Sequence, residues 1–261
     1  MAGLSFIGNF TASRVLDITL DHILKSQMNY FGIFGGSLSG SQLNQAPGAS
    51  PTTVTAHEPA NLVFGSNYFT SLAANLSAGF TSVSQPRQLD ATLFCAFTAG
   101  VPGWSAGTAF SSGLINLWGD DTGNGAGRMT IGLHKTAVGV PYIVLRWGLS
   151  ANTPILTCAI PFDWTTATGP ILVIASRDSA GGMRMEMRNN GAVYKAVATT
   201  TPVAIPSTSL NWRGFTGQLS TFQVTNQRMY AAAIWSATMT AEQMSAELDV
   251  MQVNLASHLA L

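Results

Sequence analysis

The stretch Met183-Arg184-Met185-Glu186-Met187-Arg188, followed by Asn189-Asn190-Gly191, decides the fold class of this chain. Methionines alternate with charged residues, and a period of two is typical of a strand with one inward and one outward face. The Asn-Gly pair supplies the positive φ angles of a tight hairpin turn. With the apolar run at 171–176 before it and the run at 192–198 after it, this stretch is predicted to form a three-strand meander.

Similar short apolar or alternating runs, separated by Gly, Pro, Asn and Asp, recur through the rest of the chain from about residue 55. A succession of short strands favours a two-sheet sandwich or a barrel, so the expected fold class is all-β. Strands are predicted at residues 61–64, 80–83, 91–97, 113–118, 128–134, 142–148, 155–160, 171–176, 183–188, 192–198, 217–224 and 230–235.

The first 54 residues differ from the rest, and we treat them as a separate N-terminal region ahead of a sandwich spanning residues 55–261. Apolar residues from Leu16 to Phe31 recur at helical spacing, which predicts a helix over about 14–30, with a strand at 15–20 as the alternative. The Gly/Ser/Pro-rich residues 35–51 then read as an arm, and an arm without charges can lie along a neighbouring subunit. A floppy linker is the alternative.

A second helix is expected at the other end of the chain. Thr240 and Gln243 have the spacing of a capping box, in which each side chain bonds a backbone N–H of the other. Met244, Leu248 and Met251 continue as one apolar stripe. A short C-terminal helix over about 241–255 is therefore predicted.

Charge is unusually scarce in this chain. Only 9% of the 261 residues are charged, against roughly 25% in a typical soluble domain, and twelve basic residues balance twelve acidic ones. Such a chain is not suited to neutralising phosphates, so we expect no nucleic-acid partner. It also lacks the run of about 20 apolar residues that a membrane helix needs. Near-zero net charge favours association, and we expect a homo-oligomer, specifically a trimer, within a larger assembly.

The two cysteines, Cys95 and Cys158, each lie in an apolar stretch that is predicted to be a strand. The pattern favours two buried free thiols that act as small hydrophobic side chains. One bridge between strands is the alternative, because sequence does not fix the distance between them.

The C-terminal features together resemble the concanavalin A-like, or laminin-G-like, jelly roll. The order is an apolar strand at 171–176, the Asp178-containing turn, the hairpin with its Asn190-Gly191 turn, a last strand at 230–235, and a helix opened by Thr240-Ala241-Glu242-Gln243. The resemblance covers roughly residues 55–261 and implies a carbohydrate-binding or adhesive domain. The low charge and the N-terminal arm also resemble a bacteriophage virion protein in style, such as a tail fibre, tail tip or decoration protein.

Catalytic patterns are hard to find in the sequence. A glycosidase needs two carboxyl groups that flank the scissile bond, whereas Glu186 lies between two arginines on an outward face, where a cross-strand ion pair is the simpler role. Glu58 and Asp163 are the candidates for a hydrolase with an unrecognised pair. We therefore expect no enzymatic activity, and a hydrolase is ranked last.

Two sets of residues are candidates for ligand binding. The loop with Asp120, Asp121 and Asn124 either binds calcium or is an ordinary turn, since the twelfth position of an EF-hand loop would be Ile131 rather than glutamate. Sugars bind exposed aromatic faces bordered by polar groups. Trp104, Trp164 and Trp212 occupy loop-like stretches and are the candidate sugar-facing residues, with a role as lids on the sandwich edge as the alternative.

These observations predict a non-enzymatic virion structural protein that self-assembles, needs no cofactor, and carries a lectin-like domain for host-surface glycans or virion contacts. The arm would contact other virion proteins, and assembly would take place in the host cytoplasm. A free-standing carbohydrate-binding module is the alternative function.

Overall fold

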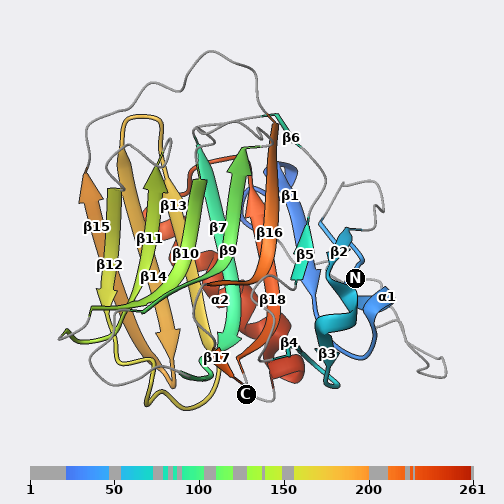
Figure 1. Ribbon diagram of the computed structural model, residues 1–261. Helices are drawn as coiled ribbons and strands as arrows, with labels where there is room; N and C mark the ends of the chain where they lie inside the picture. The colour runs from blue at the N-terminus through green and yellow to red at the C-terminus, as the bar shows by residue number, and fades with distance from the viewer. Residues whose placement is uncertain are drawn as a thin grey trace.

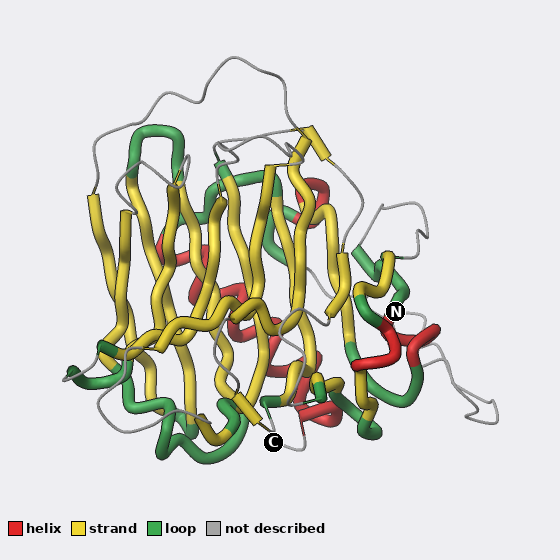
Figure 2. The backbone as a smooth tube through the Cα atoms, in the orientation of Figure 1, coloured by secondary structure: helices red, strands yellow, loops and turns green. Residues whose placement is uncertain are grey.

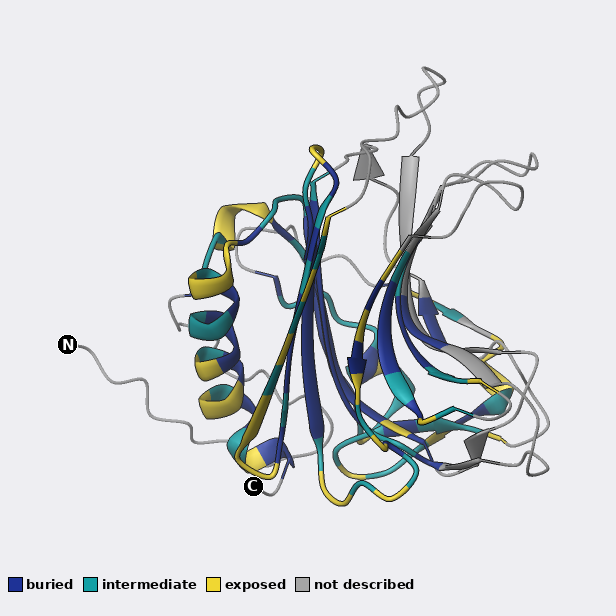
Figure 3. Ribbon diagram, turned by 90° about the vertical axis from the view of Figure 1, so that its left-hand side faces the viewer, coloured by how far each residue is buried: buried dark blue, intermediate teal, exposed yellow. Residues whose placement is uncertain are grey.

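The computed structural model describes residues 22–46, 54–72, 79–81, 85–86, 90–102, 110–119, 128–136, 139–148, 156–199, 211–220, 224–225 and 227–259. In these residues two antiparallel sheets pack face to face, and one long helix lies on the outer side of one sheet (Figures 1 and 3). The expected two-sheet antiparallel sandwich with a C-terminal helix is confirmed.

Sheet 1 is the sheet that the helix covers, and it has eight strands. In spatial order these are β15 (Ala192–Thr199), β14 (Gly182–Asn189), β13 (Ile171–Arg177), β7 (Ala91–Thr98), β18 (Arg228–Trp235), β4 (Phe69–Ser71) and β3 (Leu62–Phe64), with β1 (Met28–Ile33) paired to β18. The order shows that sequence neighbours β13, β14 and β15 form the predicted meander.

Sheet 2 forms the other layer and also has eight strands. They are β12 (Leu156–Pro161), β11 (Tyr142–Gly148), β10 (Arg128–Lys135), β9 (Phe110–Gly119), β16 (Asn211–Ser220), β5 (Gly79–Thr81) and β2 (Thr55–His57), with β6 (Gln85–Pro86) paired to β16. A small pair joins β8 (Val101–Pro102) to β17 (Val224–Thr225). The helical elements are η1 (Lys25–Gln27), α1 (Leu38–Ser41), η2 (Pro59–Asn61) and α2 (Ala241–Leu259), and Figure 2 shows α2 crossing behind the strands.

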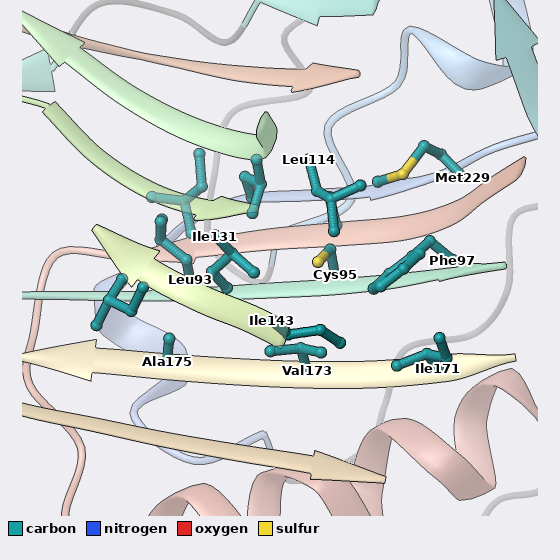
Figure 4. Packing of buried hydrophobic residues seen from close by; sticks show 14 of the residues in the cluster. Leu93, Cys95, Phe97, Leu114, Ile131, Ile143, Ile171, Val173, Ala175 and Met229 are labelled. Atoms are coloured by element: carbon teal, nitrogen blue, oxygen red, sulfur yellow. The ribbon is translucent and has the colours of Figure 1, made fainter. Parts of the chain in front are cut away.

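The main core lies between the sheets. Alternate residues of β13 and β7 point into it from sheet 1, and Leu114, Ile131 and Ile143 meet them from sheet 2 (Figure 4). Met183, Met185 and Met187 complete this layer on β14, as their alternation predicted. Each such side chain contributes about 1.5–3 kcal/mol by leaving water.

A second core lies between sheet 1 and helix α2. Leu172 and Ile174, which alternate with the inward residues of β13, pack on this side against Met244, Leu248 and Met251 of the helix. Strands buried on both faces read as continuous apolar runs, which explains why residues 171–175 show no alternation. None of the described helices, α2 included, is long and apolar enough to cross a membrane.

The turns and caps follow the local chemistry that the sequence predicted. Asn190 and Gly191 have φ angles of 48° and 78°, as a two-residue hairpin turn requires. At the start of α2, the Gln243 N–H donates to Thr240 Oγ1 at 3.2 Å, and the Thr240 N–H donates to Gln243 Oε1 at 2.9 Å. The capping box is therefore confirmed, and the helix extends four residues beyond the predicted end, to Leu259.

The prediction of a helix over 14–30 is wrong for its last residues. Lys25–Gln27 is a single 3-10 turn, and Met28–Ile33 is strand β1, which pairs with β18 inside sheet 1. The apolar residues there satisfy a strand equally well, and the edge of β18 supplies the backbone partners. Residues 1–21, including the alternative strand at 15–20, lie outside the described residues.

Two further differences concern strand boundaries. Strand β16 begins at Asn211, six residues before the predicted start at 217, and β17 is a separate short strand. Short strands β2, β4, β6 and β8 were not predicted, because runs of two or three residues carry no periodic signal. Cys95 and Cys158 are both buried and free, as the favoured interpretation predicted.

Candidate functional site

A hollow of about 450 Å³ opens at one end of the sandwich, where β12 leaves sheet 2 and the β14–β15 hairpin turns. This is the lower end of both elements in Figure 1. Its volume falls within the range of ligand pockets, about 300–1,000 Å³. The hollow is lined by Pro161, Phe162, Asp163, Thr166, Ala167, Thr168, Asn189, Asn190 and Tyr194.

The hairpin forms one wall because its turn sequence fixes the backbone. The Asn189–Ala192 pair closes the β14–β15 ladder, and the turn residues between them protrude at the end of the sheet. Asn190 is exposed, whereas Asn189 is 9% exposed. Tyr194 lies two residues beyond the start of β15 on the face that packs toward the sandwich core, and it is half-buried.

The loop after β12 forms the other wall and is shaped by one aspartate. Asp163 Oδ1 accepts hydrogen bonds from the Thr165 N–H, at 3.1 Å, and from the Thr165 hydroxyl. The Asp163 carbonyl accepts from the Thr166 N–H at 3.3 Å. An aspartate that bonds the backbone two residues on is a standard way of fixing a turn.

Side-chain amides join the two walls. Asn189 Nδ2 donates to the carbonyl oxygens of Thr168 and Pro170, at 3.0 and 3.1 Å. Asn190 Nδ2 donates to the Thr168 carbonyl at 3.0 Å and to Thr168 Oγ1 at 3.1 Å. These four bonds connect the hairpin to the loop after β12 and so hold the two walls of the hollow in a fixed relative position.

Aromatic surface forms the side of the hollow. The Phe162 and Tyr194 rings meet edge to face, with centroids 5.3 Å apart and planes inclined by 64°. Both side chains are half-buried, so each packs on the core and leaves part of its surface in the hollow. Aromatic surface beside carboxylate, amide and hydroxyl groups is suited to a pyranose, whose C–H face is apolar and whose rim is polar.

The structure overturns the sugar-facing role predicted for Trp164. This side chain is 1% exposed, packs in the main core, and donates from Nε1 to the His134 carbonyl at 3.3 Å. The polar, loop-like residues around Trp164 suggested an exposed side chain, but in the structure this side chain points into the core. Its neighbour Phe162 lines the hollow instead.

The remaining predicted sites cannot be compared with side-chain positions. Trp104, Asp120, Asp121 and Asn124 lie outside the described residues, and of Trp212 only the backbone, in β16, is described. In the described part of the chain no three His, Cys, Asp or Glu side chains form a group that could hold a metal ion.

The carboxylates considered for hydrolysis are separate in the structure. Asp163 lines the hollow, whereas Glu58 occupies the N-cap position of η2, where its carboxylate accepts from Asn61 Nδ2 at 2.9 Å. Glu186 is buried beneath α2, where it pairs with Lys195 at 3.0 Å and Arg188 at 3.2 Å. The cross-strand ion pair predicted for Glu186 is confirmed, since Lys195 is its partner in the β14–β15 register.

Sequence reasoning missed the lining residues Phe162, Asn190 and Tyr194 as a site. The sequence did contain a signal for these residues. Tyr194 closely follows the Asn190-Gly191 turn, and Phe162 directly precedes Asp163. The two segments are separated by strands β13 and β14, and only the sheet topology brings them together.

No family model matches this sequence, and no curated protein gives a significant match. Solved structures with a similar arrangement include the exoplasmic/lumenal domain of VIP36 bound to Ca²⁺ and Man2, with a TM-score of 0.48, 11% identity, and coverage of 84% of this chain and 93% of that chain. The CBM2 module of the evolved Dit protein from Lactobacillus casei BL23 phage J-1 has a TM-score of 0.47 and 8% identity, covering 82% of this chain and 97% of that chain.

A third similar structure is tailspike protein 2 from Escherichia coli O157:H7 bacteriophage CAB120, with a TM-score of 0.45 and 16% identity. The match covers 83% of this chain and 31% of the tailspike. By its own topology this chain is a sandwich of two facing antiparallel sheets, and its last strand runs into a helix, as the sequence predicted.

Proposed function

We propose that this protein binds a glycan in the hollow between the β12–β13 loop and the β14–β15 hairpin, without hydrolysing it. The observation that carries the proposal is the pre-formed hollow itself, with Phe162 and Tyr194 beside Asp163 and Asn190. An aromatic wall with a few convergent polar groups is the usual composition of a small-ligand site.

A binding role is favoured over hydrolysis by the carboxylates. Asp163 is the one carboxylate among the described residues that line the hollow, and hydrolysis of a glycosidic bond requires a pair on either side of the bond. Asp163 is also engaged in shaping its own turn through Thr165. We therefore assign it to the shape and specificity of the site.

The test is a glycan array followed by calorimetry on the best ligand. Tyr194→Ala should weaken binding about tenfold or more, because it removes ring surface from the hollow. Val197→Ala, on the same strand but 73% exposed and outside the lining, is the matched control and should bind normally. Equal affinity of the two variants would contradict the proposed site, and turnover of the glycan would contradict a non-enzymatic role.

We further propose that the protein is a self-assembling bacteriophage virion component, a trimer, with its N-terminal residues contacting other virion proteins. Support comes from the sequence: its 9% charged residues and zero net charge suit a surface that is covered in an assembly. Light scattering on the full chain should give three times the chain mass of 27.4 kDa. A stable monomer that is absent from purified particles would refute this part.

The structure sets where a truncation can be made to test the N-terminal contacts. Strand β1 pairs with five residues of β18, so a deletion that removes it would damage sheet 1. His22 and Ile23 also bond Glu247 of α2, each at 2.7 Å. Removing only residues 1–21 avoids both effects, and a loss of the trimer in that variant would assign assembly to those residues.

A further inference from the structure

Some hydrogen-bonding groups of the hollow bond to other protein groups, and others do not. The amide donors of Asn189 and Asn190 are both engaged by carbonyl groups of the opposite wall. Asp163 Oδ2 and Asn190 Oδ1, by contrast, accept no hydrogen bond from the described residues, and both residues are exposed. The groups left for a ligand are therefore the acceptor oxygens Asp163 Oδ2 and Asn190 Oδ1, together with the hydroxyl groups of Thr168 and Tyr194.

The charge of the hollow points in the same direction. Asp163 is the one ionisable carboxylate in the described lining, and that lining contains no lysine or arginine. Recognition of a sugar carboxylate normally relies on an arginine or lysine partner. A uronic or sialic acid in this hollow would instead lie near a second carboxylate with no cation to offset it.

We infer that the hollow selects an uncharged sugar residue, with Asp163 and Asn190 accepting hydrogen bonds from its hydroxyl groups, and that Asp163 determines the discrimination against anionic sugars. This inference rests on the proposed glycan-binding function and adds its ligand class. The Tyr194 and Phe162 rings contact the apolar face of the same sugar. A hydroxyl that donates to the Asp163 carboxylate makes a charge-assisted bond, which is stronger than a neutral one.

The experiment compares neutral sugars with their own uronic acids. An array that pairs galactose with galacturonic acid, glucose with glucuronic acid and mannose with mannuronic acid identifies the best neutral ligand, and calorimetry then measures that ligand and its acid. The wild-type protein should bind the neutral sugar at least tenfold more tightly. In Asp163→Asn this preference should fall below about threefold, because the charge is removed while the amide oxygen still accepts from Thr165.

The outcomes separate this inference from the proposed function. Binding of an acidic sugar as tightly as the neutral one, lost in Tyr194→Ala, would overturn the ligand class and leave the site standing. An unchanged preference in Asp163→Asn would overturn the role of Asp163. Absence of binding to every sugar tested would overturn both the function and the inference. Circular dichroism of Asp163→Asn and Tyr194→Ala confirms that the variants fold.

Discussion

Asn190 and Thr168 lie on opposite walls of the hollow, and the amide Nδ2 of Asn190 reaches both the carbonyl oxygen of Thr168, at 3.0 Å, and its Oγ1, at 3.1 Å. The hairpin tip is thereby tied to a loop 22 residues earlier in the chain. This connection makes the hollow a property of the folded sandwich and gives the first prediction.

Asn190→Asp should weaken glycan binding and lower stability by about 0.5–1.5 kcal/mol, the usual contribution of a hydrogen bond. Aspartate keeps the size of the side chain and tolerates the φ of 48°, but its oxygens cannot donate to Thr168. Urea unfolding and calorimetry measure the two effects. Ser179→Ala, in the turn between β13 and β14, is the control and should change stability by less than about 0.5 kcal/mol. Unaltered binding in Asn190→Asp would show that the two walls do not need this bond.

Arg188 provides a second prediction, because it has one buried and one exposed acidic partner. Glu186 is 3% exposed and lies 3.2 Å from Arg188, whereas Asp249 on α2 is 71% exposed. Glu186→Gln should cost about 1–3 kcal/mol, since it leaves Arg188 and Lys195 less well compensated near a buried site. Asp249→Asn should cost less than about 1 kcal/mol, as exposed pairs do. Equal losses of unfolding free energy in Glu186→Gln and Asp249→Asn, measured by urea unfolding, would contradict the idea that burial makes the Glu186 pair more important.

We expect the fold to lose stability in mild acid because of His134. Burial, followed by the nearby charge of Arg146, lowers the pKa of His134 from 6.5 to about 4. Between these pH values the unfolded chain binds a proton that the folded chain does not, so stability falls as the pH drops from about 6.5 to 4. His134→Gln should flatten this part of the urea-midpoint profile. A profile identical to the wild type would contradict the shift, and NMR titration of the imidazole tests it directly.

The two buried thiols should lower the stability of the fold at alkaline pH, whereas His134 lowers it at acidic pH. Burial raises the pKa of Cys158 from 9.0 to about 11 and also raises that of Cys95. Above pH 9 the unfolded chain loses thiol protons that the folded chain keeps, so these groups lower stability as the pH rises towards 11. At pH 8 both thiols should react with a disulfide reagent only after unfolding. Rapid reaction of one thiol in the folded protein would contradict its burial.

Where local chemistry alone decides the structure, the sequence was a sufficient guide. The alternation from Met183 to Arg188 placed methionines in the core and charges outside it. The Asn190-Gly191 turn and the Thr240–Gln243 capping box formed as predicted, because each depends on residues within a few positions. The outward side of β14 is nevertheless covered, since α2 packs over Glu186 and Arg188.

Other features depended on partners distant in the chain. The apolar residues of Met28–Ile33 fit a helix or a strand, and pairing with β18, about 200 residues later, selected the strand. The loop-like sequence around Trp164 suggested an exposed ring. In the structure the indole packs in the core and its N–H donates to the His134 carbonyl. Neither partner can be found from the residues nearby.

The sequence by itself determined the all-β class, the meander at 171–199, the final helix and the buried thiols, because periodicity, turn residues and caps act over short distances. The tertiary structure alone decided the hollow that we propose as the binding site, since Phe162 and Asp163 meet Asn190 and Tyr194 only when the end of sheet 2 packs against the hairpin of sheet 1. Side chains from separate segments converge through packing of the two sheets, and no local pattern records that packing.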